Sequence, residues 1–359
     1  MTDPTDRKIR YGFIGTGMMG REHIANVKAI PEAEVAAIAD PDENSLNLGR
    51  DLTSLDDAVC YRDYHDLIAD DSLDAIVVST PNHTHGDVVV DATQGNAHLL
   101  IEKPLAINVP ECDRIIKAAE GREKMVWVGL EYRYKPPIAR LVEEAHQGRA
   151  GVVRMVAIRE HRFPFLVKVG NWNRFNRNTG GTLVEKCCHF FDLMTLITQA
   201  QPVRVLASGS QAVNHLDELY EDEVPDIIDN AYVIIEYDNG ARAMLDLCMF
   251  AEASKNEQEL VVAGDQGKIE AFVPENIVRI GERASMELKE FEVEDERIVY
   301  QGSHEGSSYL EHLDFIDAIR SGSHEAEVTL EDGKLSVAIG VAAHLSIDEG
   351  RPVMMDEVL

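Results

Sequence analysis

The stretch Gly15-Thr16-Gly17-Met18-Met19-Gly20 follows the apolar segment 9–14 and opens a helix-length segment. In this pattern the first glycine makes a tight strand-to-helix turn, the second lets the backbone approach a pyrophosphate, and the third lets helix and strand pack closely. Asp40 ends the next apolar segment, 35–39, where a carboxylate can accept hydrogen bonds from an adenosine ribose and repel a 2′-phosphate. The stretch therefore predicts a dinucleotide site that prefers NAD to NADP, and a merely structural glycine-rich turn is the alternative.

The region from Lys8 to Leu130 alternates short apolar runs with helix-length amphipathic segments. The runs are residues 9–14, 35–39, 58–61, 75–79, 98–101 and 125–130. Strands separated by helices predict right-handed crossovers and an α/β fold with a doubly wound parallel Rossmann sheet. Ligands bind such sheets at the carboxyl ends of the strands, which selects residues 15–20, 40–42, 79–85 and 102–104 as candidate sites.

After Tyr134-Lys135-Pro136-Pro137 the pattern changes. We expect a helix at 138–147 and a longer one at 183–198, with two more at 307–320 and 330–348. The extended runs are 152–159, 203–210, 232–237, 241–249, 260–263 and 268–273, and Asp238-Asn239-Gly240 is typical of a hairpin turn. These features predict an α+β domain with an open, mainly antiparallel sheet. With 359 residues, two domains are the default expectation, and we place them at 1–130 and 131–359.

The charge is strongly acidic, with 64 Asp and Glu residues against 34 Lys and Arg residues and a formal net charge of −30. Such a chain is an unlikely partner for nucleic acid. Dispersed acidity destabilises the compact state by self-repulsion, which salt relieves. The composition therefore leaves two interpretations open, a protein adapted to high salt and an ordinary acidic mesophilic enzyme.

The chain carries no signal for a membrane or for export. No apolar run reaches about eighteen residues, and the start Met1-Thr2-Asp3-Pro4 lacks the hydrophobic stretch of a signal peptide. The spacing of the five cysteines indicates neither a disulfide framework nor a zinc site: Cys60, Cys112, Cys187, Cys188 and Cys248. We expect a cytoplasmic protein with no membrane partner and no metal.

Glu102-Lys103-Pro104 follows the strand predicted at 98–101, on the same sheet edge as the glycine loop. An ammonium at this place can hydrogen-bond a substrate hydroxyl and stabilise the alkoxide that develops as hydride leaves. A partly desolvated ammonium needs an acid to balance it, and Glu102 can do so. The alternative is a surface lysine before a turn proline.

Glu185, His189 and Asp192 fall at i, i+4 and i+7 of the helix predicted at 183–198, so they would share one face. His189 is the candidate general base, because its ordinary pKa lies near working pH, and Glu185 could orient the imidazole. A core histidine bonded to a carboxylate is the alternative. A zinc site would lack a third ligand with recognisable spacing.

The loop Ser79-Thr80-Pro81-Asn82-His83-Thr84-His85 follows the strand predicted at 75–79 and would lie against the cofactor. Asn82 can bond ribose or amide groups. We favour cofactor contact or helix capping over a metal pair, because no third histidine or cysteine lies nearby.

With these motifs in order, the chain resembles the Gfo/Idh/MocA oxidoreductases, the relatives of glucose-fructose oxidoreductase and inositol dehydrogenase. The resemblance extends to Arg133 after the sixth strand, to Trp172 ahead of Gly180-Gly181, and to Thr329-Leu330-Glu331-Asp332-Gly333. It implies a Rossmann domain followed by a domain for substrate binding and oligomerisation, with a homodimer or homotetramer formed through the C-terminal sheet.

The resemblance also implies reversible hydride transfer between NAD and a secondary alcohol of a sugar, inositol or related polyol. In that comparison Lys103 is the catalytic lysine, His189 the acid/base, and Glu185 stands at the usual aspartate. The residues implied beside the cofactor are Ser79, Thr80, Pro81, Asn82, His83, Glu102 and Lys103, and those implied beside the substrate are Lys103, Arg133, Trp172, Glu185, Lys186 and His189.

The chain departs from the family pattern in one place. The family usually reads Asp-x-Gly-x-His, whereas this chain reads Glu185-Lys186-Cys187-Cys188-His189. Two other functions remain as alternatives, a glycosidase that holds NAD and uses transient oxidation for elimination, and a regulator that senses sugar and dinucleotide without catalysis.

Overall fold

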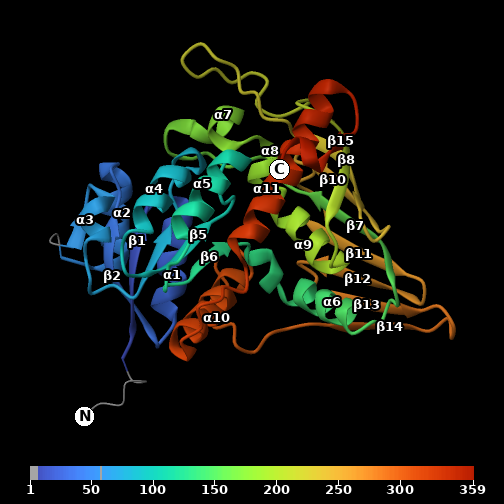
Figure 1. Ribbon diagram of the computed structural model, residues 1–359, viewed down its shortest axis with the longest axis horizontal. Coiled ribbons are helices and arrows are strands. Elements are labelled where there is room, and N and C mark those ends of the chain that lie inside the picture. Colours follow the sequence, from blue (N-terminus) through green and yellow to red (C-terminus); the bar gives the residue numbers. More distant parts are fainter. Residues whose placement is uncertain (1–6, 57–58) are drawn as a thin grey trace. The chain divides into compact units, whose positions relative to one another are not determined.

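A computed structural model describes residues 7–56 and 59–359 (Figure 1). The chain divides into two compact units. The first comprises the described part of Met1–Glu131 together with Lys168–Gly170 and Arg297–Lys334, and the second comprises Tyr132–Val167, Asn171–Glu296 and Leu335–Leu359. Among the described residues, no helix is long and apolar enough to cross a membrane.

The first unit is built on a six-stranded parallel sheet in the order β3-β2-β1-β4-β5-β6. Its strands are β1 (Ile9–Ile14), β2 (Ala33–Ala39), β3 (Cys60–Tyr61), β4 (Ala75–Val78), β5 (His98–Glu102) and β6 (Val126–Gly129). The residues of β4 and β5 are all buried, as in a parallel sheet covered on both faces. The predicted Rossmann sheet is confirmed, although Ala58 of the predicted third strand lies outside the described residues.

Five helices follow the strands of this sheet: α1 (Met18–Ala29), α2 (Glu43–Thr53), α3 (Tyr64–Ile68), α4 (His85–Ala92) and α5 (Val109–Ala119). The Asp42 carboxylate caps α2 by accepting a hydrogen bond from the Ser45 N–H at 2.8 Å. Asn108 caps α5 in the same way. α1 differs, because its N-cap is Gly17 and no side chain caps it.

Residues 297–334, which we expected in the second domain, pack with the first unit instead. The helix α10 (Ser307–Ser321) places Phe315 edge-on to Tyr11 and Trp127, with ring centroids 6.3 and 5.7 Å apart. Burial of these aromatic rings accounts for the association. Chain order conceals it, since α10 follows the second sheet in the sequence.

The second unit contains a nine-stranded sheet in the order β14-β13-β12-β11-β7-β10-β9-β8-β15. The predicted strands are β7 (Val153–His161), β8 (Pro202–Ser210), β9 (Asn230–Tyr237), β10 (Arg242–Cys248), β11 (Gln258–Gly264) and β12 (Gly267–Val273). β7 and β10 run parallel, and the other neighbouring strands run antiparallel. The sheet is therefore mixed but mostly antiparallel, and the hairpin predicted at Asp238-Asn239-Gly240 joins β9 to β10.

Three strands were not predicted: β13 (Ile277–Glu282), β14 (Leu288–Glu292) and β15 (Val353–Met354). β14 reads Leu-Lys-Glu-Phe-Glu and is mostly exposed, so it lacks the apolar alternation that marks a half-buried strand. Only its pairing with β13 makes it a strand.

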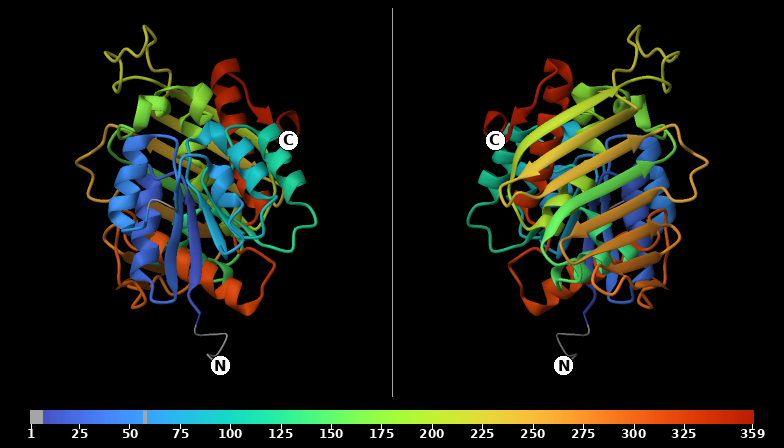
Figure 2. Two further views of the ribbon diagram at one scale, coloured as in Figure 1. Left: turned by 90° about the vertical axis from the view of Figure 1, so that its left-hand side faces the viewer. Right: turned by 90° about the vertical axis from the view of Figure 1, so that its right-hand side faces the viewer.

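Helices cover one face of the second sheet, while the right-hand view of Figure 2 shows the other face without a helix over it. On the covered face, α6 (Pro136–His146) packs on β12 and β13, and α9 (Cys188–Thr198) packs on β7. α11 (Leu330–Glu349) also belongs to this face, where Ser346 Oγ accepts a hydrogen bond from the Ala207 N–H at 2.9 Å. Along β9, Val233 and Ile235 are buried, whereas Tyr232 and Ile234 are exposed.

The single helix predicted at 183–198 is wrong, because the chain forms two helices there. α8 (Thr182–Glu185) ends before Lys186 and Cys187, and α9 begins at Cys188. The Cys188 thiol donates a hydrogen bond to the Glu185 carbonyl oxygen, with sulfur and oxygen 3.6 Å apart. Glu185 and His189 therefore do not share one face of one continuous helix.

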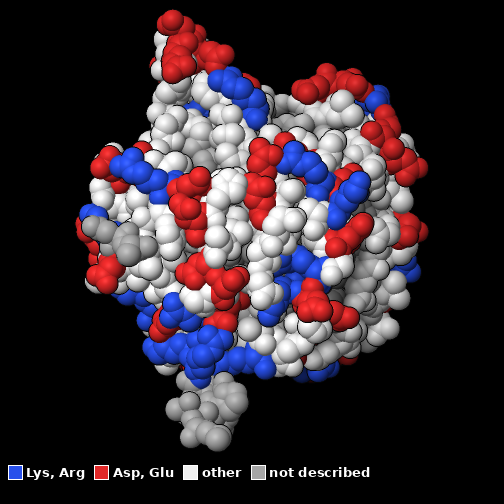
Figure 3. All heavy atoms as spheres, turned by 60° about the vertical axis from the view of Figure 1, so that its left-hand side comes forward, with Lys and Arg blue, Asp and Glu red and all other residues white. Residues whose placement is uncertain are grey.

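Acidic and basic side chains are interspersed over the face of the molecule drawn in Figure 3. Surface ion pairs such as Arg10–Glu34, at 2.8 Å, illustrate the pattern. Each exposed pair of this kind contributes little to stability. On that face, acidic side chains also gather on the protrusion at the top, and basic side chains gather near the lower edge (Figure 3).

Candidate active site

The glycine loop joins β1 to α1, and its three glycines meet different surroundings. A Cβ atom on Gly15, whose φ is +93°, would lie 2.7 Å from the Ser79 carbonyl oxygen. A Cβ atom on Gly20 would lie 1.9 Å from the Gly15 carbonyl oxygen. A Cβ atom on Gly17 would meet no heavy atom within 4 Å. The first and third glycines are required by packing, and the second faces open space, as a pyrophosphate-binding loop needs.

The start of α1 suits an anion. Gly17 supplies no capping side chain, and the first turn contains no acidic residue. The first N–H groups of a helix have no partner inside the helix, and the helix dipole favours negative charge there. Met18 and Met19 follow Gly17 directly in this turn. The residues present therefore fit a dinucleotide phosphate.

Asp40 lies at the end of β2 and is only 8% exposed. Its Oδ2 accepts hydrogen bonds from the Thr16 N–H at 2.7 Å and from the Thr16 hydroxyl at 3.2 Å. Its Oδ1 accepts one from the Asp42 N–H at 2.9 Å. A carboxylate has about four acceptor positions, so Asp40 fixes the glycine loop and keeps capacity for a ribose hydroxyl.

The loop after β4 is tied to both neighbouring loops. The Ser79 hydroxyl donates a hydrogen bond to the Gly15 carbonyl oxygen at 2.9 Å. The His85 ring lies 3.0 Å from the Thr80 carbonyl oxygen and 2.9 Å from that of Pro104. Burial lowers the pKa of His85, so the ring is neutral and its one N–H serves one of these carbonyls. His85 is therefore a structural link between the loops.

The rest of this loop forms a short 3₁₀ helix at Asn82–Thr84 after Pro81. Asn82 is buried, whereas His83 is exposed. Nothing in the arrangement brings His83 and His85 together as a metal pair, and the described residues contain no group of three or more His, Cys, Asp or Glu side chains that could hold a metal ion. Contact of Asn82 and His83 with a cofactor stays a prediction.

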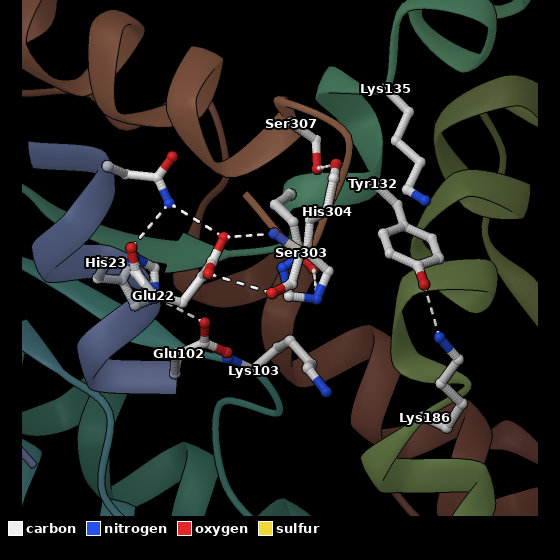
Figure 4. A network of polar contacts seen from close by, with 12 residues as sticks. Glu22, His23, Glu102, Lys103, Tyr132, Lys135, Lys186, Ser303, His304 and Ser307 are labelled. Atoms are coloured by element: carbon white, nitrogen blue, oxygen red, sulfur yellow. Dashed lines mark hydrogen bonds and ion pairs between the residues drawn. The ribbon is translucent and has the colours of Figure 1, made fainter. Parts of the chain in front are cut away.

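Lys103 follows β5 at the same edge of the sheet as the glycine loop, and a chain of buried polar groups lies behind it. Glu102 Oε2 accepts a hydrogen bond from the Lys103 backbone N–H at 3.0 Å. Glu102 Oε1 lies 2.7 Å from His23 Nε2, and His23 Nδ1 lies 2.9 Å from His312 Nε2. Figure 4 shows the Lys103 side chain extending away from the Glu102–His23 pair.

This series of buried polar groups fixes the charge of Glu102. Burial opposes ionisation of the carboxyl, but the hydrogen bond and charge of His23, with the charges of Lys103 and His304, hold the pKa of Glu102 at about 2. Burial and the neighbouring His23 lower the pKa of His312 well below its ordinary value, so His312 is neutral. An ionised Glu102 therefore balances the Lys103 ammonium.

In the second unit, His189 lies in the first turn of α9 and is 2% exposed. Its ring stacks on Tyr132, with centroids 4.1 Å apart and an interplanar angle of 10°. Glu185, at the end of α8, is 3% exposed. The catalytic roles expected for His189 and Glu185 stay predictions. The stack of His189 on Tyr132 was not expected from the sequence.

Asp192 is engaged by an arginine. Arg133 Nε donates to Asp192 Oδ2 at 2.7 Å, and Arg133 Nη2 donates to Asp192 Oδ1. The two side chains are 9% and 3% exposed. This bidentate pair neutralises the third ionisable residue that we had grouped with Glu185 and His189. It also occupies the Arg133 guanidinium that the resemblance implies for substrate.

Lys186 is turned into the protein. Its ammonium donates to the Tyr132 hydroxyl at 2.6 Å and pairs with Glu160 Oε1 at 2.9 Å. Burial and the nearby Arg162 lower the pKa of Lys186 to about 8, although Glu160 opposes the shift. The substrate role implied for Lys186 stays a prediction, and its observed contacts are with Tyr132 and Glu160.

The segment ahead of Gly180-Gly181 is ordered by its own contacts. Trp172 lies in the 3₁₀ helix Val169–Arg174, and its carbonyl oxygen accepts a hydrogen bond from Asn178 Nδ2 at 3.0 Å. Arg174 is buried and donates to Glu218 at 3.0 Å. Arg174 is thereby held by the fold, while contact of Trp172 with substrate stays a prediction.

The cysteines are free thiols in the structure, and Cys187 and Cys188 are fully buried, as expected for packing residues. Sequence reasoning missed His23, His312, Tyr132 and Glu160. His23 could have been found, because it follows the glycine loop on the inner face of α1. His312 meets His23 only through packing within the first unit, and Tyr132 and Glu160 meet Lys186 only through packing within the second.

Comparison with known proteins agrees with this architecture. Residues 9–130 match the description "Oxidoreductase family, NAD-binding Rossmann fold", and residues 143–355 match "Oxidoreductase family, C-terminal alpha/beta domain". A myo-inositol 2-dehydrogenase of Thermotoga maritima is 30% identical over 359 residues, covering 98% of this chain and 100% of the relative. A scyllo-inositol 2-dehydrogenase (NAD(+)) of Bacillus subtilis is 23% identical, covering 98% of this chain and 97% of the relative.

A solved structure of levoglucosan dehydrogenase, in complex with NADH and levoglucosan, shares the fold with a TM-score of 0.85 at 18% identity, covering 97% of this chain and 100% of that one. The two family matches together span most of the sequence, in the order of the two sheets. The chain therefore belongs to the Gfo/Idh/MocA family of NAD(P)-dependent oxidoreductases, which act on CH–OH groups.

Proposed function

We propose that the protein is an NAD-dependent dehydrogenase that reversibly oxidises a secondary hydroxyl of an inositol, sugar or related polyol. The relatives that share its full length include dehydrogenases of myo-inositol and scyllo-inositol. The residues of the sheet edge in the first unit support the same chemistry.

One observation carries the proposal, the placement of Asp40 and Lys103 on opposite sides of the glycine loop. Asp40 ends β2, on one side of β1, and Lys103 follows β5, two strands away on the other side. Neighbouring strands lie about 4.8 Å apart, so β5 is roughly 10 Å from β1. A dinucleotide with its adenosine at Asp40 and its phosphates at α1 would extend its nicotinamide toward Lys103.

Bound NAD would accept the hydride from the carbinol carbon. Lys103 would donate a hydrogen bond to the substrate oxygen and stabilise the developing alkoxide, and the ionised Glu102 would balance the charge of the ammonium. His189 would remove the hydroxyl proton as general base, and Glu185 would orient the imidazole.

The test is NADH formation at 340 nm from a panel of inositols, sugars and sugar acids. We expect Lys103→Ala and His189→Ala to keep the Kd for NAD and to lose roughly two or more powers of ten in kcat. Turnover within a fewfold of the wild type in either variant would remove that residue from the mechanism. Release of a glycosidic leaving group without net NADH would replace the dehydrogenase with an eliminating glycosidase.

We propose further that the enzyme selects NAD over NADP through Asp40. The carboxylate would repel a 2′-phosphate, and like charges at a protein surface cost about 4 kcal/mol at 4 Å. Asp40→Ala should raise the ratio of kcat/KM for NADP to that for NAD by roughly tenfold or more, although it also removes the acceptor of the Thr16 N–H. An unchanged ratio would contradict this role.

The open face of the second sheet supports a homodimer or homotetramer. Leu206, Ile234 and Met244 are paired across β8, β9 and β10 and are 43%, 43% and 40% exposed. An apolar row of this kind is suited to a second copy of the same face. Ile234→Lys should reduce the mass in light scattering to that of a monomer, and Val299→Lys, at an exposed residue of the first unit, should not. A monomeric wild type would refute the assembly.

We propose last that the dispersed acidity makes stability depend on salt. Screening of self-repulsion should raise the Tm as KCl increases from 0.1 to about 3 M. Loss of activity in molar KCl would identify an ordinary acidic enzyme instead.

A further inference from the structure

In the second unit, Tyr132 is one member of a closed ring of buried polar side chains. Lys186 joins the Tyr132 hydroxyl to Glu160, whose Oε2 accepts a hydrogen bond from Gln258 Nε2 at 2.8 Å. Lys135 donates to Gln258 Oε1 at 3.2 Å, and its ammonium lies 4.5 Å from the Tyr132 ring centroid, which closes the ring. All five side chains belong to residues that are 0 to 4% exposed.

Stability alone does not explain such a ring. It buries two ammonium groups with one carboxylate, and the transfer of charges out of water is costly. Replacing a buried ion pair by apolar residues of similar volume is often neutral or stabilising. What a fully connected polar network provides is one fixed geometry for its members. The member fixed from several sides here is Tyr132.

Tyr132 in turn holds His189. The two rings are stacked with centroids 4.1 Å apart, and Phe190 meets Tyr132 edge-on at 5.7 Å and 66°. The imidazole plane is therefore set by the phenol plane, and the hydroxyl that orients the phenol is bonded to Lys186 (Figure 4).

We propose that Lys186 is a positioning residue for the reaction, which holds the His189 imidazole in place through the Tyr132 ring. The proposal rests on the function proposed above, in which His189 is the base. It assigns a purpose to the lysine at the one place where this chain departs from the family pattern.

The ring also places two cations beside Tyr132, on which His189 stacks. The ammonium groups of Lys135, at the start of α6, and of Lys186, in the α8–α9 turn, lie 4.5 and 4.7 Å from the Tyr132 ring centroid. Arg162, after β7, pairs with Glu160 and Glu257. The pKa of Lys186 is lowered to about 8, which is still above neutral pH, so Lys186 remains mostly charged there. A nearby cation disfavours protonation of an imidazole and so favours its action as a base.

The experiment compares Lys186→Met, Tyr132→Phe and the double variant in NADH formation. Each single variant breaks the link between Lys186 and Tyr132, so we expect kcat to fall roughly ten- to a hundredfold, the effect of a small misplacement of a catalytic group. The Kd for NAD should not change. Since both act through one link, the double variant should be no slower than the slower single variant.

The pH profile separates positioning from a merely structural role. Loss of the Lys186 charge should move the acidic limb of kcat/KM to higher pH, because the imidazole is protonated more easily. Lys268→Met is the matched control, since it removes a surface lysine that also pairs with a glutamate, and it should leave kcat and the pH profile unchanged.

The proposal fails if Lys186→Met keeps kcat within twofold and the acidic limb in place, or if the two single losses multiply in the double variant. If Lys186→Met does not fold, Tyr132→Phe decides alone, because it removes only a hydroxyl, and wild-type kcat in it refutes the link. His189→Ala in parallel separates the two proposals. Full activity of His189→Ala would show that His189 is not the base. An inactive His189→Ala together with an unchanged kcat in Lys186→Met would refute only the role of Lys186.

Discussion

Gly17→Ala isolates cofactor binding from folding more cleanly than other changes in the glycine loop. The backbone of Gly17 has φ −62° and ψ −161°, an extended conformation that alanine adopts, and the added Cβ would meet no heavy atom within 4 Å. The free energy of unfolding should therefore change by about 0.5 kcal/mol or less. The methyl group would instead occupy the space in which a pyrophosphate approaches the backbone.

The size of the effect follows from the contact that is lost. A hydrogen bond between a backbone N–H and a charged phosphate contributes about 1.5 to 3 kcal/mol. Loss of one such bond weakens binding roughly ten- to a hundredfold. Titration of NADH fluorescence measures the Kd, and urea unfolding measures stability.

Gly20→Ala is the matched control, because its Cβ would lie 1.9 Å from the Gly15 carbonyl oxygen and the loop must shift to admit it. We expect it to lower the unfolding free energy by about 1 to 3 kcal/mol or more. An unchanged Kd for NADH in Gly17→Ala, with stability preserved, would refute the placement of the phosphates at α1.

Three other predictions concern buried charges. The pKa of Glu102 is lowered from 4.5 to about 2 in the folded protein, so the ionised carboxylate stabilises the fold above about pH 4.5, and this effect is lost as the pH falls through 2. In urea unfolding, Glu102→Gln should lower the unfolding free energy by about 3 kcal/mol at pH 7 and by progressively less toward pH 2. Asp192→Asn should cost about 3 to 5 kcal/mol because it leaves Arg133 buried without its counter-charge, and Arg133→Met added to it should recover part of the loss in Tm. Burial lowers the pKa of His344 from 6.5 to about 4, so the unfolding free energy should fall by about 3 kcal/mol as the pH drops from 6.5 to 4. His344→Gln keeps an acceptor for the Leu183 N–H and should abolish this pH dependence.

The first sheet and its cofactor edge could be predicted from local sequence. β4 and β5 are buried on both faces and contain the apolar runs 75–78 and 99–101, so their positions could be predicted. The glycine loop and Asp40 depend on short spacings and on backbone conformations that side chains restrict. For the same reason Lys103 could be placed at the carboxyl end of its strand.

Features that depend on distant parts of the chain could not be predicted. α10 packs on the first unit through Phe315, Tyr11 and Trp127, which no local pattern connects. The break between α8 and α9 interrupts a sequence that is helical by its spacing, and the thiol contact of Cys188 appears only in the folded chain. The stack of His189 on Tyr132 joins two elements in the same way.

The central claim is hydride transfer from a polyol carbon to NAD, and isotopic labelling tests it most directly. The enzyme is incubated with NAD and a panel of inositols and sugars that carry deuterium on their ring carbons, and the cofactor is then analysed by mass spectrometry. The account predicts NADH that contains one deuterium from the substrate, formed by the wild type and lost with Lys103→Ala and His189→Ala. Reduced cofactor without deuterium, or no reduced cofactor from any member of the panel, would contradict it.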